Sequence, residues 1–171
     1  MAEAVGKCKA AQKNPVLALP HILRGKDSQK GRQLMENWLA AGADTFLVRS
    51  LEQLGLLKEL SRSAVIRVIT DANLYTWNTR AEQFLLKTTG TQKNLRIIRT
   101  TMPLELTAQE LAQTKNAVLP RELIVYTHLP LMVSEQCVKK TLGKCDGANG
   151  RMTMTGYRQQ YQVQSVCDLC Y

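Results

Sequence analysis

The stretch Thr45-Phe-Leu-Val-Arg-Ser-Leu-Glu-Gln-Leu-Gly-Leu-Leu-Lys-Glu-Leu-Ser-Arg-Ser-Ala-Val-Ile-Arg-Val-Ile-Thr70 decides the fold of this 171-residue chain. Two short runs in it, 45–48 and 64–69, are rich in β-branched and other apolar residues, which is typical of strands. Between them, Ser50 and Gln53 have the spacing of a capping box, which marks the start of a helix. The stretch therefore predicts a strand, a helix and a second strand in that order.

The same alternation continues on both sides of this stretch. Further strands are predicted at Val16–Leu19, Leu95–Thr100 and Glu122–Tyr126. A helix is predicted over Ser28–Ala41, because its apolar side chains fall on one face and Gly42 supplies a C-terminal stop. Two more helix starts are marked by capping-box pairs, Thr79 with Glu82 and Thr107 with Glu110.

Repeated strand and helix units predict the α/β class, with parallel strands joined by right-handed crossovers. Five strands are too few for an eight-stranded barrel, which takes roughly 250 residues. The chain is therefore either an open sheet or part of a larger barrel, and we expect a parallel-stranded partial TIM-type barrel over residues 15–134. A basic lead-in is expected at 1–14 and a metal-binding segment at 135–171.

Composition and charge favour a globular protein with an anionic partner. The chain has 44% hydrophobic residues and a net charge of +9, which favours an anionic partner such as nucleic acid. No DNA partner is predicted. It has no apolar run near the roughly 20 residues of a membrane span, and its N-terminus lacks the apolar core of a signal peptide. We expect a cytoplasmic protein without membrane contact.

Four of the five cysteines gather at the C-terminal end, as Cys137, Cys145, Cys167 and Cys170. Thiols stay reduced in the cytoplasm, so this set indicates metal ligands rather than disulfides. Thiolates suit both zinc and iron-sulfur clusters, and the spacing does not separate the two. The fifth cysteine, Cys8, is interpreted as an ordinary residue.

Basic residues near the cysteines and near the first strand are candidates for substrate binding. Lys139 and Lys140 lie between two of the cysteines, where they can favour thiolates and hold phosphates. Arg24 follows the first predicted strand together with His21, and a guanidinium there can hold a carboxylate or phosphate.

Three residues near strand ends are candidates for catalysis. His128 and Asp71 follow predicted strands and Glu105 closely follows a third, and the carboxyl ends of barrel strands are where catalytic groups lie. The alternatives are a structural role for His128 and a capping role for Asp71. Neither a His-Glu-x-x-His nor a Gly-x-Ser-x-Gly motif is present, so the residues themselves give no direct support for proteolysis.

Two adjacent motifs resemble the collagenase-like peptidase family of unclassified catalytic type. They are Glu122-Leu-Ile-Val-Tyr-Thr-His-Leu-Pro-Leu-Met132 and Cys137-Val-Lys-Lys-Thr-Leu-Gly-Lys-Cys145. The segments 46–55, 70–78 and 103–106 resemble successive strand ends of the family's barrel, so the resemblance covers about Pro15 to Tyr171. Thr127, and the pair Thr155-Gly156, depart from the family pattern, which has glycine and an Asp-Arg pair there.

The resemblance implies a function that the family name does not state. Characterised relatives hold a 4Fe-4S cluster on four cysteines and hydroxylate nucleotides of tRNA or ribosomal RNA, with prephenate as implied co-substrate, while others serve oxygen-independent quinone hydroxylation. It assigns Cys137, Cys145, Cys167 and Cys170 to the cluster, and implies an N-terminal part of the barrel as partner. Three hypotheses stay open: a segment of an iron-sulfur RNA hydroxylase, a protease, and a non-catalytic metal-stabilised binding module.

Overall fold

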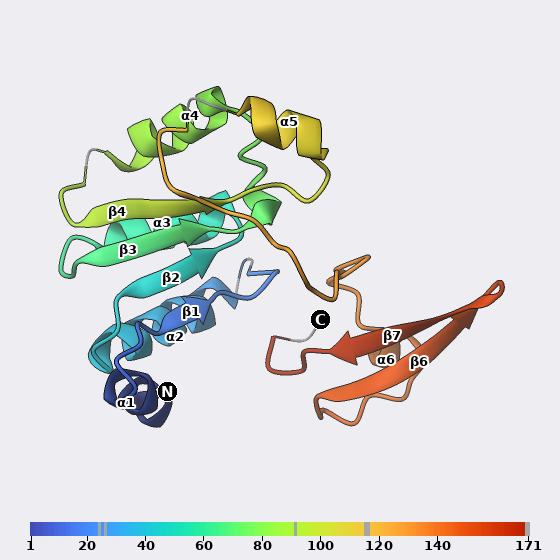
Figure 1. Cartoon of the computed structure of the whole chain (residues 1–171). Coiled ribbons are helices and arrows are strands. Elements are labelled where there is room, and N and C mark those ends of the chain that lie inside the picture. Colours follow the sequence, from blue (N-terminus) through green and yellow to red (C-terminus); the bar gives the residue numbers. More distant parts are fainter. Residues whose placement is uncertain (24, 26, 91, 115–116, 170–171) are drawn as a thin grey trace. The chain divides into compact units, whose positions relative to one another are not determined.

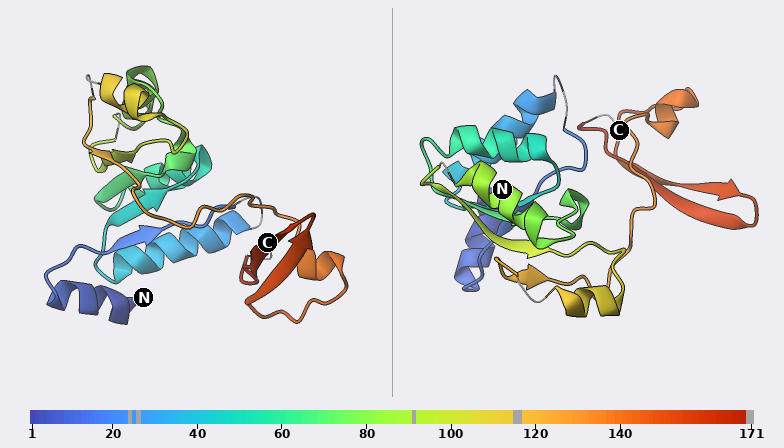
Figure 2. Two further views of the ribbon diagram at one scale, coloured as in Figure 1. Left: turned by 45° about the vertical axis from the view of Figure 1, so that its right-hand side comes forward. Right: turned by 90° about the horizontal axis from the view of Figure 1, so that it is seen from above.

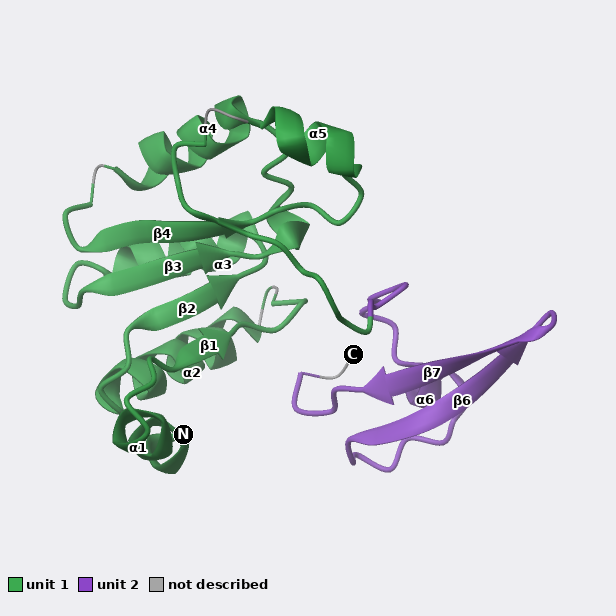
Figure 3. Ribbon diagram, in the orientation of Figure 1, with its two compact units in different colours: residues 1–128 green, residues 129–171 purple. Residues whose placement is uncertain are grey.

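The chain forms two compact units. The computed structural model describes residues 1–23, 25, 27–90, 92–114 and 117–169. Unit 1 comprises Met1–His128 and unit 2 comprises Leu129–Tyr171 (Figure 3). The predicted boundary between barrel and metal-binding segment, after residue 134, lies a few residues beyond this division.

Unit 1 is built on a five-stranded parallel sheet, which confirms the α/β class (Figure 1). Its strands lie in sequence order: β1 (Val16–Ala18), β2 (Thr45–Val48), β3 (Ile66–Thr70), β4 (Leu95–Thr101) and β5 (Arg121–Glu122). Every neighbouring pair is parallel. A sheet whose strand order follows the chain directs all its carboxyl ends to one edge, which is where a site is expected.

Helices connect the strands of unit 1 and cover one face of the sheet. They are α1 (Ala2–Ala10), α2 (Asp27–Ala40), α3 (Leu51–Leu60), the 3-10 turn η1 (Ala72–Leu74), α4 (Thr79–Thr89) and α5 (Ala108–Gln113). The core joins apolar side chains of α2, α3 and α4 to alternate residues of the strands, among them Phe46, Val68 and Ile97. Figure 2 shows α2 and α3 on the same side of the sheet. The opposite face is open enough that Val16 is 41% exposed.

The helix starts show which capping predictions hold. Ser50 caps α3 by accepting a hydrogen bond from Gln53 N, and Thr107 and Glu110 form a complete capping box at α5. At α4 the prediction was wrong by one residue, because the Asn78 amide rather than the Thr79 hydroxyl accepts from Ala81 N. Both side chains are good caps, and asparagine ranks slightly above threonine at this position.

The fifth strand is much shorter than the predicted Glu122–Tyr126. Its ladder to β4 covers only Arg121 and Glu122, and ends with Met102 N donating to Glu122 O at 2.9 Å. The next residue, Pro103, has no backbone N–H and fixes its own φ, so it cannot continue the ladder. Residues 123–126 are therefore left outside the sheet.

Unit 2 contains one short helix and one hairpin. The helix is α6 (Val138–Thr141), and the hairpin pairs β6 (Gly150–Gly156) with β7 (Gln159–Ser165) in antiparallel register. No described helix of either unit is both long and apolar enough to cross a membrane.

A buried carboxylate ties α4 to the far edge of the sheet. Glu82 is fully buried, and it accepts hydrogen bonds from Arg121 Nε at 3.0 Å and from Val118 N at 3.2 Å. Its partners come from the segment that leads into β5. The Glu82 carboxylate therefore holds the last strand, whose own ladder is too short to do so.

We expect Glu82→Ala to lower the free energy of unfolding by about 3 kcal/mol, because it leaves the buried Arg121 guanidinium without its partner. Urea denaturation followed by fluorescence of the buried Trp38 measures the change. The matched control is Glu59→Ala, which removes the exposed partner of Arg32 and is expected to cost less than about 1 kcal/mol. Equal losses in both variants would contradict the role assigned to Glu82.

Candidate functional site

Three of the four predicted metal ligands belong to the described part of unit 2. Cys137 lies directly before α6, Cys145 in the loop after it, and Cys167 just beyond β7. All three are free thiols, half-buried at Cys137 and Cys167 and exposed at Cys145. Cys170 lies outside the described residues.

The loop between α6 and the hairpin is organised by one lysine. Lys139 is only 9% exposed, and its ammonium donates to both carboxylate oxygens of Asp146, at 2.8 and 3.1 Å, and to the Ala148 carbonyl at 2.9 Å. The hydrogen bond to Asp146 is the main cause that raises the pKa of Lys139, and Lys139 in turn lowers the pKa of Asp146. These three bonds use all the donors of the ammonium group.

Two of the thiols lie within electrostatic reach of that ammonium. Electrostatic interactions with Cys167 and Cys145 are among the smaller causes that raise the pKa of Lys139. Cys167 is held in this place by its backbone N–H, which donates to Asn149 Oδ1 at 2.6 Å, and by its thiol, which donates to the Ala148 carbonyl at 3.0 Å. The fold thus brings residues 145–149 and Cys167 together around a buried positive charge.

Unit 2 has almost no hydrophobic core. Among its described residues the only buried side chains are Lys139 and Ser165, and both are polar. A segment of this size that lacks an apolar core normally needs a disulfide, a metal ion or a partner to be stable. No three described His, Cys, Asp or Glu side chains converge as ligands, so the described residues do not form a complete ligand set.

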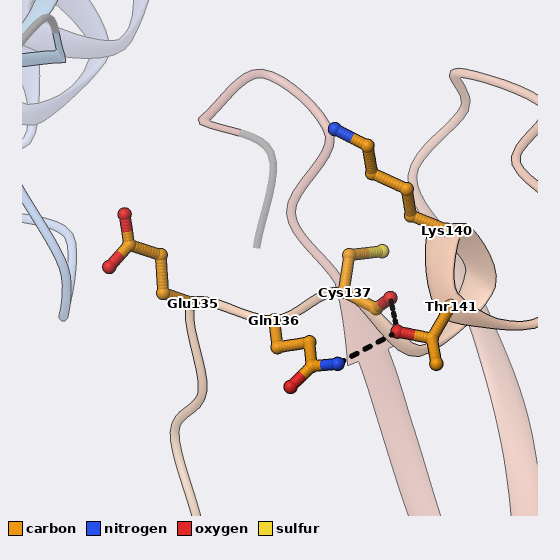
Figure 4. Close-up of a pocket in the computed structure, with 5 residues that line it drawn as sticks. All are labelled: Glu135, Gln136, Cys137, Lys140 and Thr141. Atoms are coloured by element: carbon orange, nitrogen blue, oxygen red, sulfur yellow. Dashed lines mark hydrogen bonds between the residues drawn. The ribbon is translucent and has the colours of Figure 1, made fainter.

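Lys140, unlike Lys139, faces an open pocket. The pocket has a volume of about 340 Å³ and is lined by Glu135, Gln136, Cys137, Lys140 and Thr141. In Figure 4 the Cys137 sulfur and the Lys140 side chain lie on the same side of the backbone, and Gln136 points to the other side, where it donates to Thr141 Oγ1 at 3.3 Å. The predicted role of Lys140 in substrate binding stays a prediction. The Lys139 ammonium does not suit the same role, because its three donors are already bonded within unit 2.

A second candidate site lies in unit 1, where each strand ends in a polar side chain. The five residues, one at or just beyond the end of each strand from β1 to β5, are His21, Arg49, Asp71, Thr101 and Glu122. Part of this edge forms a pocket of about 250 Å³, lined by Leu47, Asp71, Thr101, Glu122, Leu123 and Ile124. The parallel topology therefore places two carboxylates and a hydroxyl around one pocket.

Arg49 ties three strand ends together. Its guanidinium donates from Nε to Asp71 Oδ2 at 3.2 Å and from Nη1 to the Leu19 carbonyl at 2.9 Å. Its backbone N–H donates to Gln53 Oε1 at 2.8 Å, and the Gln53 amide donates to the Pro20 carbonyl at 2.6 Å. These partly buried contacts fix the guanidinium beside the pocket. Its positive charge compensates the negative charge of the Asp71 carboxylate.

The carboxylates of the pocket are each anchored on one side. Asp71 caps η1 and accepts from the Asn73 backbone and side-chain nitrogens at 3.1 and 2.7 Å, which bears out the predicted capping alternative. Glu122 pairs with Arg99 at 3.1 Å and lies 3.4 Å from the Thr101 hydroxyl. The arginines thus balance the negative charge, while the lining of the pocket presents oxygen acceptors.

Of the three predicted catalytic residues, only Asp71 lines this pocket. Glu105 is exposed, and His128 is exposed with its ring 6.2 Å from that of Tyr126 in an edge-on contact. Arg24 lies outside the described residues. Sequence reasoning missed Arg49, Thr101 and Glu122, although the position of Arg49 directly after Val48 is the signal that could have identified it.

The comparisons with known proteins give no match: no family model, curated protein or solved structure corresponds to this chain.

The strand-end cluster predicts a pH dependence of stability. Burial, and then the neighbouring Arg49 guanidinium, lower the pKa of His21 below its ordinary value of 6.5, against an opposing contribution from Asp71. Between the folded-state pKa and 6.5 the folded chain holds fewer protons on His21 than the unfolded chain. The free energy of unfolding must therefore rise with pH across this interval and fall as pH drops through it.

We expect His21→Gln to flatten this part of the stability profile, measured as the urea midpoint at a series of pH values from about 5 to about 8. The control is His128→Gln, which replaces the exposed histidine and is expected to leave the profile unchanged. A profile that keeps its slope in His21→Gln but loses it in His128→Gln would contradict the assignment.

Proposed function

We propose that this chain is part of an iron-sulfur enzyme of the collagenase-like peptidase family, with the cluster held by unit 2 through Cys137, Cys145, Cys167 and Cys170. The observation that carries the proposal is that unit 2 buries only polar side chains among its described residues, yet gathers two free thiols around a buried ammonium. A metal centre would supply the cohesion that a hydrophobic core supplies in larger units.

The proposed donor set of four thiolates is compatible with an iron-sulfur cluster and with zinc. Four thiolates are the usual ligands of a 4Fe-4S cluster. Thiolates carry a negative charge, which the Lys139 ammonium partly compensates from within the unit. When bound, an iron-sulfur cluster supplies electron transfer, and its potential depends on nearby charge and hydrogen bonds.

Unit 1 is proposed to be part of a TIM-type barrel. Parallel strands in sequence order, with the helices of the core on one face, are the arrangement of successive units of such a barrel. The resemblance implies that an N-terminal barrel part completes it. The pocket at the strand ends then occupies the position of a substrate site, with Asp71 as the proposed catalytic carboxylate and His128 and Glu105 as the other proposed catalytic groups.

RNA is the proposed substrate. The charge of +9 suits a polyanion, and Arg24 and Lys140 are the proposed contacts. The resemblance implies hydroxylation of a tRNA or ribosomal RNA nucleotide, with prephenate as co-substrate, in the cytoplasm. Proteolysis, the activity in the family's name, has no observation of its own in the described residues.

We expect the anaerobically purified chain to contain iron and sulfide, about four of each, and to absorb in the visible region. Cys137→Ala and Cys167→Ala are expected to lose most of this iron, because each removes one ligand. Cys8→Ala is the matched control and is expected to keep it, since Cys8 lies in α1 of unit 1.

Metal analysis separates the alternatives. A colourless chain with one tightly bound zinc would replace the redox enzyme by a metal-stabilised module, and a chain with neither metal would overturn the proposal. Iron-loaded protein is then incubated anaerobically with RNA and prephenate, and nucleoside mass spectrometry is expected to show an added oxygen. Cleavage of a protein substrate by the same preparation, retained after removal of contaminants, would favour the protease instead.

A further inference from the structure

The hairpin of unit 2 has two chemically distinct faces that are both largely exposed. Register pairs Met152 with Val163 and Met154 with Tyr161 on one face. The other face pairs threonine and arginine with glutamine: Arg151 with Gln164, Thr153 with Gln162, and Thr155 with Gln160. An isolated two-stranded hairpin is marginally stable in water, so a hairpin that exposes both faces is expected to have a partner.

The charge of the hairpin restricts the kind of partner. Residues 150–165 contain two arginines, four glutamines and no acidic residue. The hairpin residues alone therefore carry two positive charges and no negative one. A surface with guanidinium groups and many amides suits a partner that offers negative charge together with hydrogen-bonding edges.

The turn of the hairpin carries an aromatic and cationic pair. Tyr157 is 87% exposed, and the guanidinium carbon of Arg158 lies 5.0 Å from the centre of its ring. Arg158 has a backbone φ of 64°, a left-handed conformation that residues other than glycine rarely adopt. Figure 1 and the right-hand view of Figure 2 place this turn at the end of the hairpin far from α6. The pair is thus presented at the tip of unit 2.

A second tyrosine lies beside the same turn. A Cβ atom on Gly156 would lie 3.4 Å from Cε2 of Tyr161, so the ring of Tyr161 lies against this glycine. The Tyr161 hydroxyl donates to Gln159 Oε1 at 2.6 Å, and the residue remains 40% exposed. Two aromatic rings therefore flank the position of Gly156, one on the turn and one on the apolar face.

We propose that the turn of this hairpin, the hairpin surface formed by Tyr157, Arg158 and Tyr161, binds single-stranded RNA. Unstacked bases stack on exposed tyrosine rings and on arginine planes, while guanidinium groups contact phosphates and amides contact base edges. This inference rests on the proposed function, because it names where the RNA substrate docks outside the strand-end pocket. An apolar protein partner would use the methionine face but has no need of the guanidinium at the turn.

The test is equilibrium binding of a fluorescently labelled single-stranded RNA of about 12 nucleotides to the whole chain, followed by anisotropy at several salt concentrations. Tyr157→Ala is expected to weaken binding about tenfold, the loss of one stacked base. Arg158→Gln is expected to reduce the slope of log K against log salt by about 0.7, the loss of one phosphate contact to a single strand.

Matched controls come from another aromatic and arginine pair on the surface. Phe84→Ala and Arg80→Gln alter exposed residues one turn apart on α4, and both are expected to leave the affinity and the salt slope unchanged. A duplex of the same sequence is expected to bind more weakly than the single strand, because its bases are not available for stacking. Thermal melting of each variant checks folding, and truncating the highly exposed Tyr157 is expected to leave it unchanged.

The outcomes distinguish this inference from the proposed function. If Tyr157→Ala and Arg158→Gln both bind RNA as tightly as the unaltered chain, the hairpin surface is not the RNA-binding site, and RNA remains the proposed substrate. No RNA binding at all, in a chain that holds iron, would overturn both the hairpin surface and the RNA substrate. A Tyr157→Ala variant that melts earlier but binds RNA normally would show that the ring packs within the protein instead.

Discussion

Right-handed crossovers between neighbouring parallel strands are the constraint on which unit 1 depends. Because β1 to β5 lie in sequence order, the crossover rule sends the connecting helices to one face and all five strand ends to one edge. The helices bury Phe46 and Val68 on one face of the sheet, and on the other face Thr45 and Ile69 are buried while Val16 of the edge strand is exposed. The same rule gathers His21, Arg49, Asp71, Thr101 and Glu122 at one edge, although they are widely separated in the chain.

Charge compensation then decides which of these side chains are available to contact a ligand in the pocket. Arg49 is fixed by Asp71 and by a backbone carbonyl from the end of β1, so its guanidinium mainly holds the neighbouring strand ends together. Both oxygens of each carboxylate have partners: those of Asp71 accept from Asn73 and Arg49, and those of Glu122 contact Arg99 and Thr101. Unit 2 is stabilised in a different way. It has no apolar core among its described residues, and its loop depends on the three hydrogen bonds of the Lys139 ammonium.

Local pattern was sufficient for β1 to β4 and for α2 to α5, but it missed α1 and misplaced β5, and long-range contacts account for the residue roles that it missed. The run 45–48 is β2 as predicted, and Thr107 with Glu110 forms the predicted capping box. The spacing of Glu82 from Thr79 predicts a capping role. In the structure its carboxylate is buried in the core and accepts a hydrogen bond from Arg121, which is distant in sequence. The burial of Lys139 is equally invisible in sequence, since a lysine between cysteines has the same local pattern whether it faces solvent or Asp146.

The turn of the hairpin favours stacking of its cation over ion pairing. Neither Thr155 nor Gly156, which precede the turn, carries a charge, and residues 150–165 contain no acidic side chain. Gly156 has no side chain to displace the ring of Tyr161, and the Arg158 guanidinium rests on the ring of Tyr157. A hairpin with an acidic residue at position 155 would have an internal partner for its cations, so its affinity for a polyanion should be lower and less dependent on salt.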